Sequence, residues 1–68
     1  MQLSARNQLA GTVKAVTLGT VMAEVTVDVG GQDVVAAITR HSAESLGLAE
    51  GDAITVVIKA TEVLLARE

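Results

Sequence analysis

The feature that most constrains the fold is a nearly strict alternation of apolar and polar residues over Thr20–Val29. Odd-numbered positions from Val21 to Val29 hold Val or Ala, and even-numbered positions hold Thr, Met, Glu or Asp. A period of two with one polar face predicts a half-buried antiparallel strand, with the valine stripe in the core. Gly30-Gly31 follows directly and predicts a tight hairpin, because both central residues of such a turn can need a positive φ.

Four further segments share the strand pattern of β-branched or apolar residues bounded by turn residues. In the strand after the hairpin turn, residues 32–39, the centre Val34–Ile38 is apolar on both faces. This suggests burial on both sides, with another subunit on the outer side. A kink near Ala60 separates the segments 53–59 and 61–66. The predicted strands cover residues 11–18, 20–29, 32–39, 53–59 and 61–66, with turns at 18–20, 30–31 and 50–52.

Between the third and fourth predicted strands the pattern changes to that of a short helix. Ser42 is predicted as its N-cap, Glu44 in the first turn complements the helix dipole, and Gly47 ends the helix in the left-handed conformation. This order predicts an all-β fold: an OB-like, five-stranded, partly open antiparallel barrel with one short helix between strands three and four. A small SH3-like barrel is the alternative that the order of strands leaves open.

The apolar half of the chain consists mainly of small side chains. Val and Ala make up most of the 50% of residues that are apolar, and the chain contains no aromatic residue and no Cys. A core built from 68 residues without large side chains or disulfides is thin. The mean hydropathy of +0.50 implies much apolar surface, so we expect homo-oligomerisation to supply the missing stability.

Composition also argues against several classes of function. No run approaches the ~20 apolar residues that span a bilayer, and no basic segment followed by an apolar one marks a secretory signal, so we expect a cytoplasmic protein without a membrane partner. The net charge of −3 and the lack of aromatic residues disfavour nucleic acid as a partner. With one His, no Cys, no nucleophile elbow and no Gly-rich phosphate loop, neither an enzyme nor a metal-cation site is expected.

Three of the five cationic residues stand beside small hydroxyl residues, where the regular strand alternation is interrupted. Hydroxyls, backbone N–H groups and a Lys or Arg are the components of an oxyanion site. The groups are Ser4 with Arg6, Thr39 and Ser42 with Arg40, and Lys59 with Thr61.

Three of these residues, and the single histidine, also have a plain structural interpretation, which the sequence leaves open. These interpretations are a helix cap for Ser42, a solvated edge charge for Lys59, an interface arginine for Arg6 and a surface residue for His41.

Residues 4–11 read S-A-R-N-Q-L-A-G, which resembles the S-A-R-N-Q-L-x-G opening of the molbindins, the small molybdate-binding Mop domains. Two later segments, ITRHSAESLGL from Ile38 and VIKATEVLLA from Val57, match that family's pattern in the same order. The resemblance covers the whole chain and implies a single Mop domain over residues 1–68. It also implies a homo-oligomer, namely a hexamer built as a trimer of dimers.

The resemblance further implies which residues bind an oxyanion. In molbindins the principal pocket lies at a subunit interface, with donors from the S-A-R-N segment of one chain and the T-R-x-S and I-K-A-[ST] segments of its neighbour. Carried over by position, the set is Ser4, the backbone N–H of Ala5, Arg6, Thr39, Ser42, Lys59 and the backbone N–H of Ala60. The family has a second pocket on threefold axes, for which the candidates here are Gly19, Thr20, Arg40 and His41.

A pocket lined by donors and free of carboxylates suits a fully deprotonated tetrahedral dianion, because a protonated phosphate would leave its O–H unpaired. The expected ligand is molybdate or tungstate, with no cofactor, and the expected task is intracellular molybdenum storage or homeostasis. Two other classes remain open: a structural or interaction β-barrel module without a ligand, and a nucleic-acid-binding OB module, which the negative charge disfavours.

Overall fold

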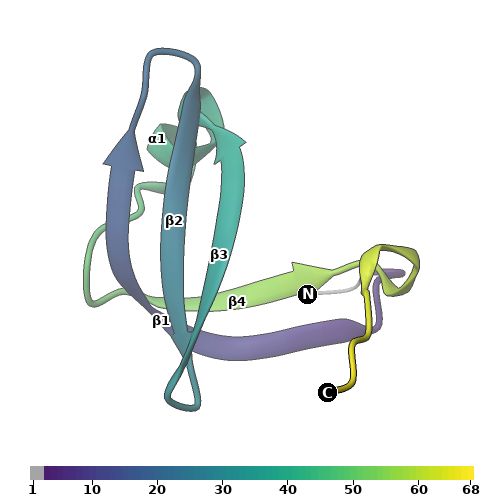
Figure 1. Ribbon diagram of the computed structural model, residues 1–68. Helices are drawn as coiled ribbons and strands as arrows, with labels where there is room; N and C mark the ends of the chain where they lie inside the picture. Colours follow the sequence, from purple (N-terminus) through teal and green to yellow (C-terminus); the bar gives the residue numbers. More distant parts are fainter. Residues whose placement is uncertain (1–2) are drawn as a thin grey trace.

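The computed structural model describes residues 3–68, which form one antiparallel sheet with a short helix at one end of it (Figure 1). Neighbouring strands follow the order β3-β2-β1-β4, and every neighbouring pair is antiparallel. The elements are β1 (Asn7–Leu18), β2 (Met22–Val29), β3 (Gln32–Thr39), α1 (Arg40–Leu46), β4 (Ala53–Ile58) and the 3₁₀ turn η1 (Ala60–Glu62).

Strand β1 is long and sharply curved, and it pairs with a different partner over each half (Figure 1). Its first half pairs with β4 and its second half with β2. The register shifts between Val13 and Ala15, and such a bulge increases the local bend of a strand. Lys14, the residue at the bulge, reaches beyond β2 to Asp33 on β3, with its Nζ 3.1 Å from both carboxylate oxygens. The start of β1 lies earlier than the predicted residue 11, because pairing with β4 extends the strand back to Asn7.

The central hairpin and the core confirm the alternating pattern over most of its length. Gly30 and Gly31 have φ of 59° and 88°, as the tight turn requires. The buried apolar residues are Val13, Ala23, Val25, Val27 and Ala43. The prediction was wrong at one end, where Val21 is 70% exposed, because it lies in the turn before β2 and has no strand partner.

The helix begins earlier than predicted, so its capping residue differs. Thr39, not Ser42, is the N-cap, and Thr39 Oγ1 accepts a hydrogen bond from the Ser42 backbone N–H. Glu44 therefore lies beyond the first turn, which contains no acidic residue, and it pairs with Arg40 one turn back. Gly47 ends the helix at φ 63° as predicted.

The predicted fifth strand is absent from the described part of the chain, where four strands form the sheet. The kink near Ala60 is present as η1, but no strand follows it in residues 63–68. A β-like segment forms a strand only when a neighbouring strand offers hydrogen bonds, and this segment has no such neighbour among residues 3–68 of a single chain. Its side chains Leu64 and Leu65 are 92% and 93% exposed. Strands β3 and β4 are therefore both sheet edges in a single chain.

Strand β3 is covered on one face in a single chain. Val34, Ala36 and Ile38 are half-buried, whereas Val35 on the opposite face is 58% exposed. The expected burial on both sides is not reached within one chain. Among residues 3–68, the structure contains no helix that is long and apolar enough to cross a membrane.

Candidate functional site

The N-terminal segment and the end of β4 meet at one corner of the sheet (Figure 1). The β1–β4 pairing ends at Asn7 opposite Ile58, and the Asn7 Nδ2 donates to the Ile58 carbonyl at 3.1 Å. Arg6 and Lys59 are the next residues outward on the two strands, and both are exposed. This pairing brings Ser4, Ala5 and Arg6 of the predicted site to the same corner as Lys59 and Ala60.

The two cations of this corner differ from Lys14 on β1 and Arg40 on α1, each of which has a carboxylate partner. Lys14 is paired with Asp33, and Arg40 is paired with Glu44. Within residues 3–68, Arg6 and Lys59 make no ion pair and no side-chain hydrogen bond. The corner therefore presents positive charge that the described residues do not neutralise.

Backbone geometry holds Lys59 and Ala60 in a tight turn. Lys59 precedes η1, and its carbonyl accepts the backbone N–H of Glu62 at 2.9 Å. The backbone N–H of Ala60 is the first of this turn and has no carbonyl partner among the described residues. It can donate to a ligand, as the sequence interpretation requires.

Thr39 and Ser42 lie together, but at the other end of the sheet. Thr39 of β3 pairs with Met22, the first residue of β2, and this end of β2 lies beside Leu18, the last residue of β1. Asn7 is the first residue of β1 and therefore lies at the opposite end of that strand. The Thr39 hydroxyl donates to Ser42 Oγ at 2.8 Å, so these two predicted donors are adjacent. One chain thus holds the predicted principal site as two separate groups: Ser4–Arg6 with Lys59–Ala60, and Thr39 with Ser42. The sequence-based prediction grouped Lys59 and Ala60 with Thr39 and Ser42 on the neighbouring chain, but the β1–β4 pairing places them beside Ser4–Arg6 of the same chain.

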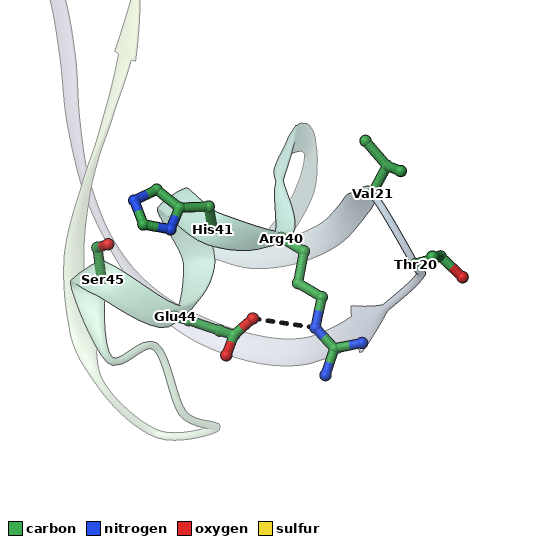
Figure 2. A pocket seen from close by; sticks show the side chains of 6 residues that line it. All are labelled: Thr20, Val21, Arg40, His41, Glu44 and Ser45. Carbon is green, nitrogen blue, oxygen red and sulfur yellow. Dashed lines mark hydrogen bonds and ion pairs between the residues drawn. The ribbon is translucent and has the colours of Figure 1, made fainter.

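Three of the four residues named for a second site, Thr20, Arg40 and His41, line an open hollow of about 540 Å³ beside the first turn of α1 (Figure 2), and Gly19 does not line it. The Arg40 guanidinium donates from Nη1 to the Gly19 carbonyl at 3.3 Å and from Nε to Glu44 at 3.0 Å. In Figure 2 the Glu44 carboxylate points at Arg40 and accepts the bond from its Nε, so one edge of the guanidinium is occupied. The hollow is lined by Thr20, Val21, Arg40, His41, Glu44 and Ser45.

The sequence-based prediction assigned no role to Asn7 and Gln8, the two amides of the opening segment. Asn7 crosses to β4, and Gln8 Nε2 donates to the Ala5 carbonyl at 3.0 Å. The signal that could have identified them is their position in the sequence, between the candidate donors Ser4–Arg6 and the predicted start of the first strand at residue 11. No group of three or more His, Asp or Glu residues within residues 3–68 is arranged to hold a metal ion.

Comparisons with known proteins point to one family. The TOBE domain model matches residues 3–65 of the chain. Molybdenum-pterin-binding protein 3 of Clostridium pasteurianum is 48% identical over 66 residues, which cover 96% of this chain and 97% of that protein.

Solved structures agree with that match. A molybdate-binding protein from Sporomusa ovata superimposes with a TM-score of 0.94 at 45% identity, covering 98% of this chain and 100% of its own. The cytoplasmic molybdate-binding protein ModG, with molybdate bound, gives a TM-score of 0.84 at 46% identity and covers 88% of this chain and 43% of its own. These likenesses confirm the all-β, OB-like architecture.

Proposed function

Because this chain belongs to the TOBE-domain family and to the molbindins, we propose that it binds molybdate and tungstate at the interfaces of a homo-oligomer. The proposed task is intracellular storage or homeostasis of molybdenum, carried out by residues 1–68 as one Mop domain. Relatives named for binding molybdate or molybdenum-pterin, each matching nearly the whole chain, support this proposal.

The observation that carries the proposal is the corner formed by Arg6 and Lys59. Two cations on adjacent strand ends, without a carboxylate partner among residues 3–68, favour an anion between them. The exposed Ser4 hydroxyl and the Ala60 N–H add neutral donors to the same corner. The lining we propose is Ser4, Ala5, Arg6, Lys59 and Ala60, completed by Thr39 and Ser42 from another copy.

The position of α1 in this chain supports a contribution from another copy. Thr39 and Ser42 lie at the end of β1 opposite Asn7, so a pocket that uses both groups must draw on at least two chains. This separation supports an interface site over a pocket within a single chain.

The donor chemistry suits a dianion of a strong acid. Guanidinium, ammonium, hydroxyl and amide N–H groups all donate, so a protonated phosphate would find no acceptor for its O–H, at a cost of about 1–3 kcal/mol. Sulfate is smaller than molybdate and would leave some donors at longer distances. Tungstate is nearly the size of molybdate, so we propose that the site binds the two alike.

Exposed apolar surface supports the homo-oligomer, for which we propose a hexamer built as a trimer of dimers. An apolar groove of about 210 Å³ lies between the two sheet edges, with lining residues from both β3 and β4. The segment 61–66 carries the exposed Leu64 and Leu65 and shows the β-like pattern. We propose that this segment of a second copy pairs with one of the two open edges, because it has no strand partner among residues 3–68 and its leucine side chains are exposed in a single chain.

We further propose that the protein is cytoplasmic and is not an enzyme. We propose no membrane partner and no nucleic-acid partner. ModG is described as cytoplasmic, and the similar proteins are named for binding rather than for catalysis.

Calorimetric titration of the assembled protein with molybdate, tungstate, sulfate and phosphate tests the function. We expect similar affinities for molybdate and tungstate, and much weaker binding of sulfate and phosphate. The variant Lys59→Ala should lose affinity, whereas Lys14→Ala, at the Asp33 pair, is the matched control and should bind normally. Equal affinity for sulfate would contradict the selectivity, and no heat with any oxyanion would favour a structural module without a ligand.

A further inference from the structure

Asn7 links the two strands that carry the unneutralised cations. Its Nδ2 donates to the carbonyl of Ile58, the last residue of β4, across a sequence separation of 51 residues. The bond is partly buried, and the Asn7 side chain is half-buried, unlike that of the neighbouring Gln8, which is exposed. The Asn7 side chain therefore stabilises the fold by joining β1 to β4 at the last pair of the two strands.

The register places the two cations at the same end of this strand pair. The pairing of β1 with β4 ends at Asn7 opposite Ile58, and Arg6 and Lys59 are the first residues beyond that last pair, one on each side. Like charges that lie close together at the end of an antiparallel pair repel one another. The Asn7–Ile58 bond joins the two strands at that end and so opposes the repulsion.

We propose that Asn7 is a positioning residue of the oxyanion site: its bond to the Ile58 carbonyl holds Arg6 and Lys59 together before the anion arrives. This inference rests on the proposed function and deepens it. In this role Asn7 acts through the strand pair, because its amide bonds the Ile58 carbonyl of β4. It reduces the ordering that binding would otherwise require, which is how preorganisation raises affinity.

The test measures the Kd for molybdate, by calorimetry, of variants that remove this bond. In Asn7→Leu the side chain keeps its approximate shape without a donor, and in Asn7→Ser it is too short to span the strands and adds no bulk. Each should raise the Kd about tenfold, as loss of an outer partner does at metal sites. Asn7→Gln keeps an amide donor and should recover most of the affinity.

Two controls separate positioning from general stability. Gln32→Leu makes a similar amide-to-leucine change at an exposed position without a side-chain hydrogen bond to residues 3–68, and should keep the wild-type Kd. Gly30→Ala strains the hairpin at φ 59° and should lower the melting temperature without changing the Kd. A rise in Kd in both Asn7 variants, with neither control affected, is the expected result.

The outcomes also separate this inference from the function on which it rests. If the wild type does not bind molybdate, the proposed function fails and the role of Asn7 fails with it. If the wild type binds, Lys59→Ala does not, and Asn7→Leu or Asn7→Ser keeps the wild-type Kd, then only the positioning role is overturned.

Discussion

Thr39 and Ser42 exchange two hydrogen bonds at the start of α1. The Ser42 backbone N–H donates to Thr39 Oγ1 at 3.0 Å, and the Thr39 hydroxyl donates to Ser42 Oγ at 2.8 Å. Thr39 thus satisfies one of the unpaired N–H groups of the helix, while the hydroxyl proton of Ser42 remains available to a ligand. The two hydroxyls differ in what they contribute to the unliganded protein.

Because of that difference, we expect Thr39→Ala to affect stability and Ser42→Ala to affect molybdate binding. Thr39→Ala removes the cap and should lower the free energy of unfolding by about 1 kcal/mol. Ser42→Ala keeps the cap, so it should leave the stability of the unliganded protein nearly unchanged while weakening molybdate binding. Urea denaturation without ligand, followed by calorimetry with molybdate, measures both effects. Equal destabilisation by the two changes would contradict the assignment of the cap to Thr39.

Gly11 of β1 lies against the backbone and side chains of β2. A Cβ there would come within 2.7 Å of the Asp28 carbonyl oxygen and of a methyl group of Val27. We expect Gly11→Ala to lower the free energy of unfolding by about 1–3 kcal/mol, because overpacking forces backbone or side-chain shifts. Thermal and urea unfolding measure the change.

The matched control for this glycine is Gly30→Asn. A Cβ at Gly30 meets nothing within 4 Å, and Asn tolerates the φ of 59°. Its cost should be smaller than that of Gly11→Ala, and the reverse order would show that close approach does not explain Gly11.

Glu44 competes for Arg40 at the hollow shown in Figure 2. If a second anion binds there, Glu44→Gln should strengthen that binding, because the amide no longer neutralises the guanidinium. The ion pair is exposed, so we expect a loss of stability of only about 0.3–0.5 kcal/mol. Calorimetry with molybdate, with Glu24→Gln on β2 as control, measures the number and affinity of sites. An unchanged titration in Glu44→Gln would remove this hollow as a second site.

Leu64 and Leu65 predict how the copies assemble. Both are more than nine-tenths exposed in a single chain, at 92% and 93%. The double change Leu64→Asp with Leu65→Asp should shift the protein towards monomer in analytical ultracentrifugation, because charges at a buried interface are costly. Arg67→Gln, two residues further along, should leave assembly unchanged. A double variant that assembles like the wild type would exclude this segment from the interface.

The hairpin, the left-handed end of the helix and the kink near Ala60 could be predicted because each depends on residues close together in the chain. Gly30-Gly31 and Gly47 owe their roles to their own backbone freedom. The helix cap was assigned to the wrong hydroxyl, because Thr39 also fits the end of a strand and either residue can cap. The segment 61–66 has the composition of a strand but finds no strand partner within residues 3–68, and composition does not report partners.

For the candidate site, the order of residues was enough to indicate which side chains carry donors, and which segments resemble a molybdate-binding family. Only the folded chain shows that Ser4–Arg6 meets Lys59–Ala60 through the pairing of Asn7 with Ile58, and that Thr39 and Ser42 lie at the opposite end of β1. The physical reason is that a period of two specifies which face of a strand is apolar. It does not specify which distant strand supplies the hydrogen bonds, and that pairing decides which donors share a site.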